Sequence, residues 1–265
     1  MKRFFSIFSL FIAIFCVFLC KPNVFKNQTK ATSSTPKMAI VIDDFGSFDQ
    51  SGVTTLLTSN VPLTCAVIPN VDFSEQNIND VLKANKELIL HMPMQSHVNL
   101  PEDWYGPVYI KNTDSPETAI QKIETCLKDF PEIKGFNIHI GSGVSQNKTL
   151  MTAIYDFAKQ NNLYFLDSRT IETHATEDAC KNTNSIYLGR DVFLEPNNNR
   201  SYAGVKARLA EGASLALEKG YAIVIGHVGA EGGENTARAI VESAKNIESM
   251  GVKLVTLSEI FEDLK

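Results

Sequence analysis

The sequence has 265 residues, of which 44% are hydrophobic and 21% are charged, and its formal net charge is −5. This composition is typical of a globular protein, and the length allows one large domain or two small ones. The acidic balance and the lack of a basic run in the sequence argue against a nucleic-acid partner.

The chain begins with an apolar segment. Met1-Lys2-Arg3 precedes the stretch 4–20, FFSIFSLFIAIFCVFLC, which carries no charge. As a helix this stretch would span about 26 Å, at the short end of what crosses a bilayer. We expect residues 1–20 to be a signal or membrane-anchor segment. An uncleaved anchor is preferred; a cleaved signal peptide and a lipid anchor at Cys20 are the alternatives, and Leu19 suits neither. All three alternatives predict an extracytoplasmic location, in the cell envelope, and the preferred anchor makes this segment the membrane contact.

Residues 21–37 are polar, rich in Ser, Thr and Lys, and lack periodicity, so we expect a flexible linker. The domain then covers residues 38–265. Its cysteines, Cys65, Cys126 and Cys180, are odd in number and lack metal-like spacing, which favours buried free thiols over a disulfide framework.

From residue 38 onward, short apolar runs alternate with longer amphipathic stretches. The predicted strands are 38–43, 63–68, 87–92, 135–140, 163–167, 186–194, 221–227 and 252–257. The predicted helices are 48–59, 74–85, 116–129, 148–161, 201–219 and 234–250. The strands are continuous apolar runs rather than alternating ones, which is typical of parallel strands covered on both faces.

This alternation predicts an α/β fold, either an irregular or incomplete (β/α) barrel or a doubly wound open sheet. The barrel is preferred, because Asp43-Asp44-Phe45-Gly46 stands where an open nucleotide-binding sheet would carry a glycine-rich phosphate loop. The long polar and aromatic segment 93–114 holds Trp104, and it is either a structural cover over the barrel mouth or a substrate platform.

Polar side chains recur where the predicted strands end. The C-terminal ends of parallel barrel strands gather at one mouth, where active sites form. The residues that would converge there are Asp43, Asp44, His91, His139, Asp167, Arg169, Asp191 and His227. Each also has a structural interpretation. A histidine at a strand end is commonly a packing residue, Asp167 and Arg169 could form an ion pair, and Asp191 could pair with Arg190.

The residue types favour a divalent metal such as zinc, which binds histidine nitrogen and carboxylate oxygen and leaves a position for water in catalytic sites. One Asp with His91 and His139 would supply three ligands, and the second Asp could take a proton from water. His227 could then protonate a leaving group. Alternation along the strand would point Asp43 and Asp44 in different directions. Such a set suits hydrolysis of an amide or ester.

Seven segments, in this order, carry a resemblance to a known family: VIDDFG, CAVIPN, LHMPMQ, GFNIHIGS, FLDSRT, RDVFL and IGHVG. With them the chain resembles the divergent polysaccharide deacetylase family from residue 38 to about 262. That family is a branch of the chitin and peptidoglycan deacetylase superfamily, carbohydrate esterase family 4. The resemblance implies an irregular (β/α)7 barrel, a divalent metal that we expect to be zinc, and a polysaccharide substrate.

The resemblance also implies roles for single residues. Asp43 corresponds to the catalytic base, Asp44 to a metal ligand and His227 to the general acid. The main superfamily carries its histidine ligands as H-x3-H, whereas Gln95 stands four positions after His91. The histidine ligands implied for the divergent branch are His91 and His139.

Two further departures from the family pattern affect substrate contacts, since Gln95 stands where the branch often has Glu, and Ile138 where it often has Asn. We expect Asp167, Arg169 and Asp191 to bind or orient the substrate.

The main functional hypothesis is a metal-dependent deacetylase acting on N-acetylated cell-envelope polysaccharide. The alternative is a non-catalytic envelope protein that binds glycan or a partner on the same barrel, suggested by the altered histidine arrangement and the membrane tether. A phosphoesterase is less favoured, because only Arg169 and Arg190 supply positive charge near the expected mouth.

Overall fold

The computed structural model describes residues 35–130 and 133–265. The predicted anchor segment 1–20, and all of the predicted linker 21–37 except its last residues, lie outside the described part of the chain. Within the described ranges, no helix combines the length and the apolar character needed to cross a membrane.

In the described part of the chain, nine strands form one parallel sheet. They are β1 (Lys37–Phe45), β2 (Thr64–Val67), β3 (Glu87–Met94), β4 (Gly135–Ile140), β5 (Tyr164–Asp167), β6 (Leu188–Gly189), β7 (Val192–Phe193), β8 (Tyr221–His227) and β9 (Lys253–Val255). The helices are α1 (Val53–Leu57), α2 (Ser74–Lys83), α3 (Pro116–Leu127), α4 (Lys148–Gln160), α5 (Ala175–Asn182), α6 (Tyr202–Lys219), α7 (Gly233–Ser249) and α8 (Leu257–Leu264). Every strand predicted from the apolar runs has a counterpart, although the run 186–194 forms two short strands and the bounds of the others differ modestly.

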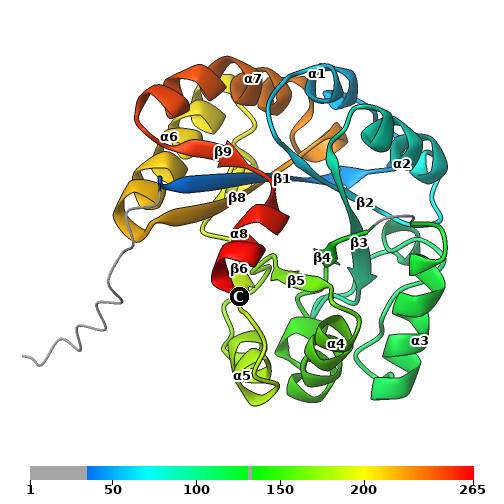
Figure 1. The fold of residues 1–265 in the computed structure, drawn as a ribbon. Helices are drawn as coiled ribbons and strands as arrows, with labels where there is room; N and C mark the ends of the chain where they lie inside the picture. The colour runs from blue at the N-terminus through cyan, green and yellow to red at the C-terminus, as the bar shows by residue number, and fades with distance from the viewer. Residues whose placement is uncertain (1–34, 131–132) are drawn as a thin grey trace, which may run out of the picture. The chain divides into compact units, whose positions relative to one another are not determined.

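The sheet is curved. The strands at the two ends of its path, β6 and β7, are consecutive in the chain, so the two edges of the sheet lie close together. The strand order is β6-β5-β4-β3-β2-β1-β8-β7, and β9 pairs with the beginning of β1. Only Arg190 and Asp191 separate β6 from β7, so the predicted strand 186–194 is broken in two. Its first part pairs with β5 and its second part with β8. The described domain is thus an α/β half-barrel of parallel strands (Figure 1).

Alternate residues of each strand enter two different cores. In β1, Ile40 and Ile42 belong to the larger core, together with buried residues of the surrounding helices. Ala39 and Val41 belong to a smaller core with inward residues of β3, β5 and β8. Helix α8 joins this inner core through Leu257 and Ile260, and in Figure 1 it lies across the hollow of the curved sheet. The inner face of the sheet is therefore filled near the start of the strands.

Local signals fix several helix ends as predicted. Ser115 caps α3, accepting a hydrogen bond from the backbone of Thr118, and Pro116 opens the helix. Gly220 ends α6 in the left-handed region at φ 92°. Helices α5 and α8 were not predicted, and the predicted strand 252–257 runs too far, since Leu257 already begins α8.

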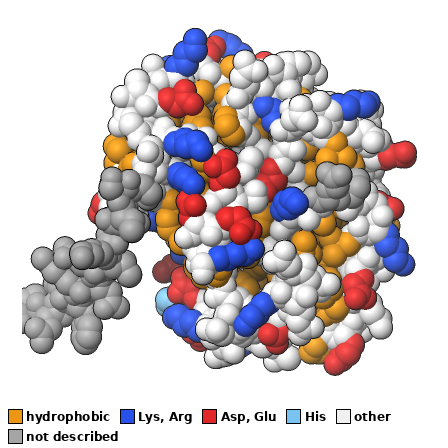
Figure 2. Space-filling model, in the orientation of Figure 1, with side chains coloured by type: hydrophobic (Ala, Val, Ile, Leu, Met, Phe, Trp, Pro, Cys, Tyr) orange, Lys and Arg blue, Asp and Glu red, His pale blue; other side chains and the backbone are white. Residues whose placement is uncertain are grey.

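The three cysteines of the domain are buried and free, as predicted. On the face shown in Figure 2, acidic and basic side chains are interspersed rather than gathered by sign. This pattern offers no single-sign patch on that face for a polyanionic partner.

Candidate active site and metal centre

The polar cluster lies on the inner face of the sheet, one layer beyond the inner core. Asp43 follows Ala39 and Val41 at two-residue spacing in β1, and His91 follows Ile89 in the same way in β3. Strand register then places neighbours side by side. Asp43 is level with His227, and His91 is level with Asn137. Residues far apart in the sequence therefore meet at the C-terminal ends of four strands.

Asp44 reaches the same face through a bulge. The register between β1 and β2 shifts between Ile42 and Phe45, and Asp44 has a φ of 67°. In an unbroken strand Asp44 would point away from Asp43, as alternation predicts. Instead both carboxylates lie near His91, whose Nε2 is 3.8 Å from Asp43 Oδ2 and 3.3 Å from Asp44 Oδ1. The expectation that alternation separates the two carboxylates was therefore wrong, because the left-handed backbone at Asp44 turns its side chain inward.

Asp44, His91 and His139 form a group that could hold a metal ion, with their donor atoms all within 4.8 Å of one another. Asp44 Oδ1 lies 3.3 Å from His91 Nε2 and 3.2 Å from His139 Nδ1. Ligand atoms bound at about 2.0–2.2 Å to one zinc ion are about 3.0–3.5 Å apart. The two separations involving Asp44 therefore match those of atoms that share a cation.

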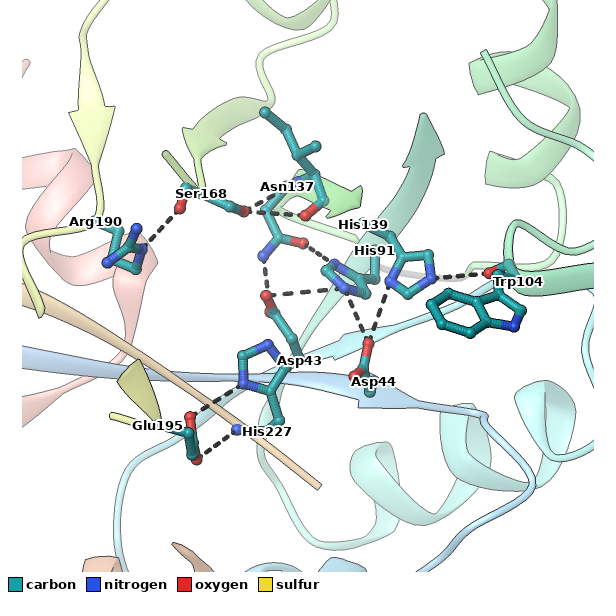
Figure 3. A network of polar contacts seen from close by, with 11 residues as sticks. Asp43, Asp44, His91, Trp104, Asn137, His139, Ser168, Arg190, Glu195 and His227 are labelled. Atoms are coloured by element: carbon teal, nitrogen blue, oxygen red, sulfur yellow. Dashed lines mark hydrogen bonds and ion pairs between the residues drawn. The ribbon is translucent and has the colours of Figure 1, made fainter. Parts of the chain in front are cut away.

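Hydrogen bonds hold each histidine with its inner nitrogen free for a cation (Figure 3). His139 Nε2 lies 3.1 Å from the backbone oxygen of Trp104, which can only accept, so this nitrogen carries the proton. Asn137 Nδ2 donates to Asp43 Oδ1 at 2.8 Å, which turns Asn137 Oδ1 toward His91 Nδ1 at 2.7 Å. With their outer nitrogens engaged in this way, both histidines can give the lone pair of the inner nitrogen to a cation that replaces the proton there, the arrangement that outer partners impose on metal-binding histidines. The residues fit a divalent cation.

The surroundings of the two adjacent carboxylates shift their pKa values in opposite directions. Burial raises the pKa of the Asp43 carboxyl above its ordinary value, and the nearby His91 and His227 offset part of this effect. Burial also acts to raise the pKa of Asp44, but its contacts with His139 and His91 hold that pKa well below its usual range. Asp43 is accordingly the better proton acceptor of the pair, and Asp44 is the better permanent anion.

His227 lies beside Asp43 and has a carboxylate partner of its own. Its Nδ1 is 3.2 Å from Oε2 of Glu195, and its backbone N–H donates to Oε1 of the same residue. The Thr236 hydroxyl also donates to Oε1 at 2.6 Å and fixes the carboxylate. Burial alone would lower the pKa of His227, but the hydrogen bond to Glu195 and the nearby Asp44 and Asp43 raise it to about 9. His227 is therefore protonated at neutral pH, as a general acid must be.

The structure brings five of the predicted site residues together, namely Asp43, Asp44, His91, His139 and His227. Among the described residues, the predicted substrate-orienting residues make their contacts elsewhere. Asp167 lies two residues after Phe165, which faces the larger core, so it belongs to the outer face of β5 rather than to the site. It accepts hydrogen bonds from Thr176 and Tyr187.

The other two residues in that group are engaged in similar structural contacts. Arg169 donates to the Tyr187 hydroxyl and to the backbone oxygen of Arg190. Asp191 pairs with Lys219 and accepts from the backbone N–H of Ile223, four residues before His227 in β8. Their substrate role stays a prediction, and their present contacts brace the loops around β6 and β7.

Two residues of the site, Asn137 and Glu195, were missed from the sequence. Strand periodicity could have found both. Asn137 is two positions from His139 in β4, and Glu195 is two positions beyond Phe193, which faces the inner core. Once one residue of a strand is assigned to the site, its neighbour at two-residue spacing becomes a candidate.

A comparison with protein-family models matches residues 40–261 to the model described as "Divergent polysaccharide deacetylase". The chain belongs to the divergent polysaccharide deacetylase family. The resemblance read from the seven sequence segments is thus confirmed, and it covers nearly all of the described domain.

Curated relatives include the uncharacterized protein YibQ of Escherichia coli K12, 29% identical over 195 residues. That match covers 72% of this chain and 58% of the relative, so the chain spans little more than half of that protein.

Among solved structures, an uncharacterized protein of Agrobacterium tumefaciens C58 aligns with a TM-score of 0.76 at 16% identity, covering 86% of this chain and 91% of the other. The catalytic domain of a peptidoglycan N-acetylglucosamine deacetylase from Eubacterium rectale aligns with a TM-score of 0.51 at 13% identity, covering 85% and 90%. Likenesses at these identities show a shared deacetylase-type fold.

Proposed function

We propose that this protein is a metal-dependent deacetylase that removes acetyl groups from N-acetylated sugars of cell-envelope polysaccharide. The observation that carries the proposal is the Asp44, His91 and His139 group, whose free nitrogens and carboxylate converge beside Asp43 and His227. Family membership and the deacetylase-type fold support the reaction class. The uncharged stretch 4–20 supports an extracytoplasmic, membrane-anchored location, where such a polysaccharide is found.

The proposed reaction needs two proton transfers, one to Asp43 and one from His227. Asp44, His91 and His139 would hold the cation, which we expect to be zinc and which supplies Lewis-acid polarisation of the acetyl carbonyl. Asp43 takes a proton from a water molecule as the water oxygen bonds to the carbonyl carbon. His227 then gives its proton to the amide nitrogen as the C–N bond breaks. Acetate and a free amine on the sugar are the products.

A deacetylation assay tests this proposal on the full-length chain loaded with zinc. The substrate is an N-acetylglucosamine oligomer, and acetate and free amine are both measured. Asp43→Asn and His227→Ala should each lower kcat by about 10²- to 10⁴-fold while the zinc content stays unchanged, because neither residue is assigned to hold the cation. Asp178→Asn, at an exposed carboxylate of α5, is the matched control and should behave as wild type.

One result of this assay would contradict the catalytic proposal. A zinc-loaded wild-type chain that binds the oligomer but releases neither acetate nor amine would overturn the catalytic proposal. It would leave the non-catalytic glycan-binding protein as the better reading of the same barrel.

A further inference from the structure

We propose that the indole ring of Trp104 is a sugar-stacking surface that binds a pyranose ring of the glycan beside the metal centre. This inference rests on the proposed function, which it extends from the reacting acetamide to recognition of the polysaccharide. It concerns a side chain to which the reaction itself gives no role.

The first argument is the position of the ring. The backbone oxygen of Trp104 holds His139 Nε2 at 3.1 Å, so the residue is fixed at the edge of the metal-binding group. Figure 3 shows the indole beside His139 and Asp44. The ring is therefore in a position to contact a sugar whose acetamide reaches Asp44 and His139.

The second argument is exposure. Trp104 is 61% exposed, an unusual state for the largest apolar side chain. Of the six large hydrophobic side chains that are exposed in the described residues, Phe48, Val98 and Trp104 lie in the segments that follow β1 and β3. Those two strands carry Asp43, Asp44 and His91 at their ends. Three of these six side chains thus lie in segments that leave the C-terminal ends of strands carrying site residues.

The third argument is rigidity. The base of the Trp104 segment is closed by hydrogen bonds between Ile110 and the backbone of Pro93 and Gln95. Next to Trp104, the buried Tyr105 stacks on Tyr109 at 4.5 Å. Its hydroxyl also accepts a hydrogen bond from the backbone N–H of Ser96. A ring presented on a braced segment loses little conformational freedom on binding.

These features suit a pyranose better than a purely apolar ligand. A pyranose in the chair form has a face of C–H bonds and a rim of hydroxyl groups. The C–H face packs on an aromatic ring while the rim stays in water, which matches a ring that is open on one side. Of the two roles expected for segment 93–114, structural cover or substrate platform, this inference favours the platform and assigns it to Trp104.

The experiment uses the fact that Trp104 is the only tryptophan in the chain. Its fluorescence is recorded on the full-length, zinc-loaded protein during titration with tetra-N-acetylchitotetraose. We expect a saturable change in emission. In the deacetylation assay, Trp104→Ala should raise KM about ten-fold with kcat within two-fold of wild type, and Trp104→Phe should restore part of the loss.

The zinc affinity of Trp104→Ala should match wild type, because the group that contacts His139 is a backbone oxygen. Leu217→Ala, an exposed apolar residue of α6, is the control and should change nothing. An unchanged KM, or emission that ignores the oligomer while acetate is released, would overturn the inference and leave the proposed function standing. Saturable emission without acetate release would instead overturn the proposed function and support the glycan-binding surface.

Discussion

Asn137 determines which nitrogen of His91 faces the metal-binding group. Its amide joins Asp43 to His91 through hydrogen bonds of 2.8 and 2.7 Å, and all three side chains are buried. Because Asp43 accepts from the amide nitrogen, the amide oxygen is left to accept from His91 Nδ1. Asn137 therefore links the proposed base to a proposed ligand without being either.

The first prediction concerns this link. Asn137→Ala removes the partner of His91 Nδ1, so the imidazole loses its fixed orientation. We expect zinc affinity, measured by competition with a chromogenic chelator, to fall about 10- to 100-fold. Asn79→Ala, at an exposed asparagine of α2, is the control. A dissociation constant within two-fold of wild type would show that Asn137 does not position His91.

The second prediction concerns Glu195 and the pH dependence of the reaction. The pKa of His227 is raised to about 9, with the Glu195 hydrogen bond the largest of the influences that raise it. Since His227 donates a proton, activity should fall as the pH rises through that value. Glu195→Gln removes the negative charge and lowers the pKa of His227. The alkaline limb of the kcat profile should therefore move to lower pH by about one to two units.

The control for this prediction is Glu218→Gln, an exposed glutamate of α6. An alkaline limb that stays in place in Glu195→Gln would mean that His227 is not the group that titrates. A loss of activity at every pH, with no movement of the limb, would point to a structural role for Glu195.

At the scale of elements, the sequence predicted strands well because burial on both faces leaves continuous apolar runs. It failed where the cause is not local. Helix α8 begins at Leu257 with backbone N–H groups bound by Glu87, which is 170 positions away in the sequence. Helix α5 has eight residues, and of the three that it buries, Thr176, Ala179 and Cys180, only two are apolar, so its pattern is too short to predict a helix. The bulge at Asp44 likewise follows from pairing with β2, which no local pattern reveals.

The third prediction belongs to this element contact. Glu87 accepts hydrogen bonds from the buried Thr64 hydroxyl and from the backbone N–H groups of Leu257 and Ser258 at the start of α8. Glu87→Ala takes this acceptor from the Thr64 hydroxyl and the Ser258 N–H, and it leaves the Leu257 N–H with Thr64 Oγ1 as its remaining partner. The free energy of unfolding should therefore fall by about 1–3 kcal/mol. Urea denaturation measures the change, and kcat per folded molecule should not change, because Glu87 is at the opposite end of β3 from the site.

Glu259→Ala is a matched control for this variant. Glu259 also lies in the first turn of α8, but it makes only an exposed ion pair with Lys253. Its loss should alter stability by no more than about 0.5 kcal/mol. Equal effects of the two variants would contradict the capping role assigned to Glu87.

At the scale of the whole domain, the site exists only when the sheet is formed. Its five central residues lie between positions 43 and 227, on β1, β3, β4 and β8. The rule that parallel strand ends share one mouth predicted this convergence from the sequence. It could not separate Asp43 and His227 from Asp191, because the rule does not give the depth of a residue along its strand.

This dependence of the site on the folded sheet gives the last prediction. A cation bound by Asp44, His91 and His139 joins the ends of β1, β3 and β4, and the unfolded chain does not hold these residues together. Zinc at 100 times its dissociation constant should stabilise the fold by about 2.7 kcal/mol. For a domain of this size, that corresponds to a rise in Tm of about 5–11 °C.

Thermal unfolding with and without zinc measures this rise, and His139→Ala should remove most of it at the same zinc concentration. Asp178→Asn should keep the full rise, since its carboxylate pairs with Lys148 on the surface. A rise that survives in His139→Ala would mean that zinc stabilises the protein from another site. The comparison therefore tests the location of the metal without relying on any measurement of activity.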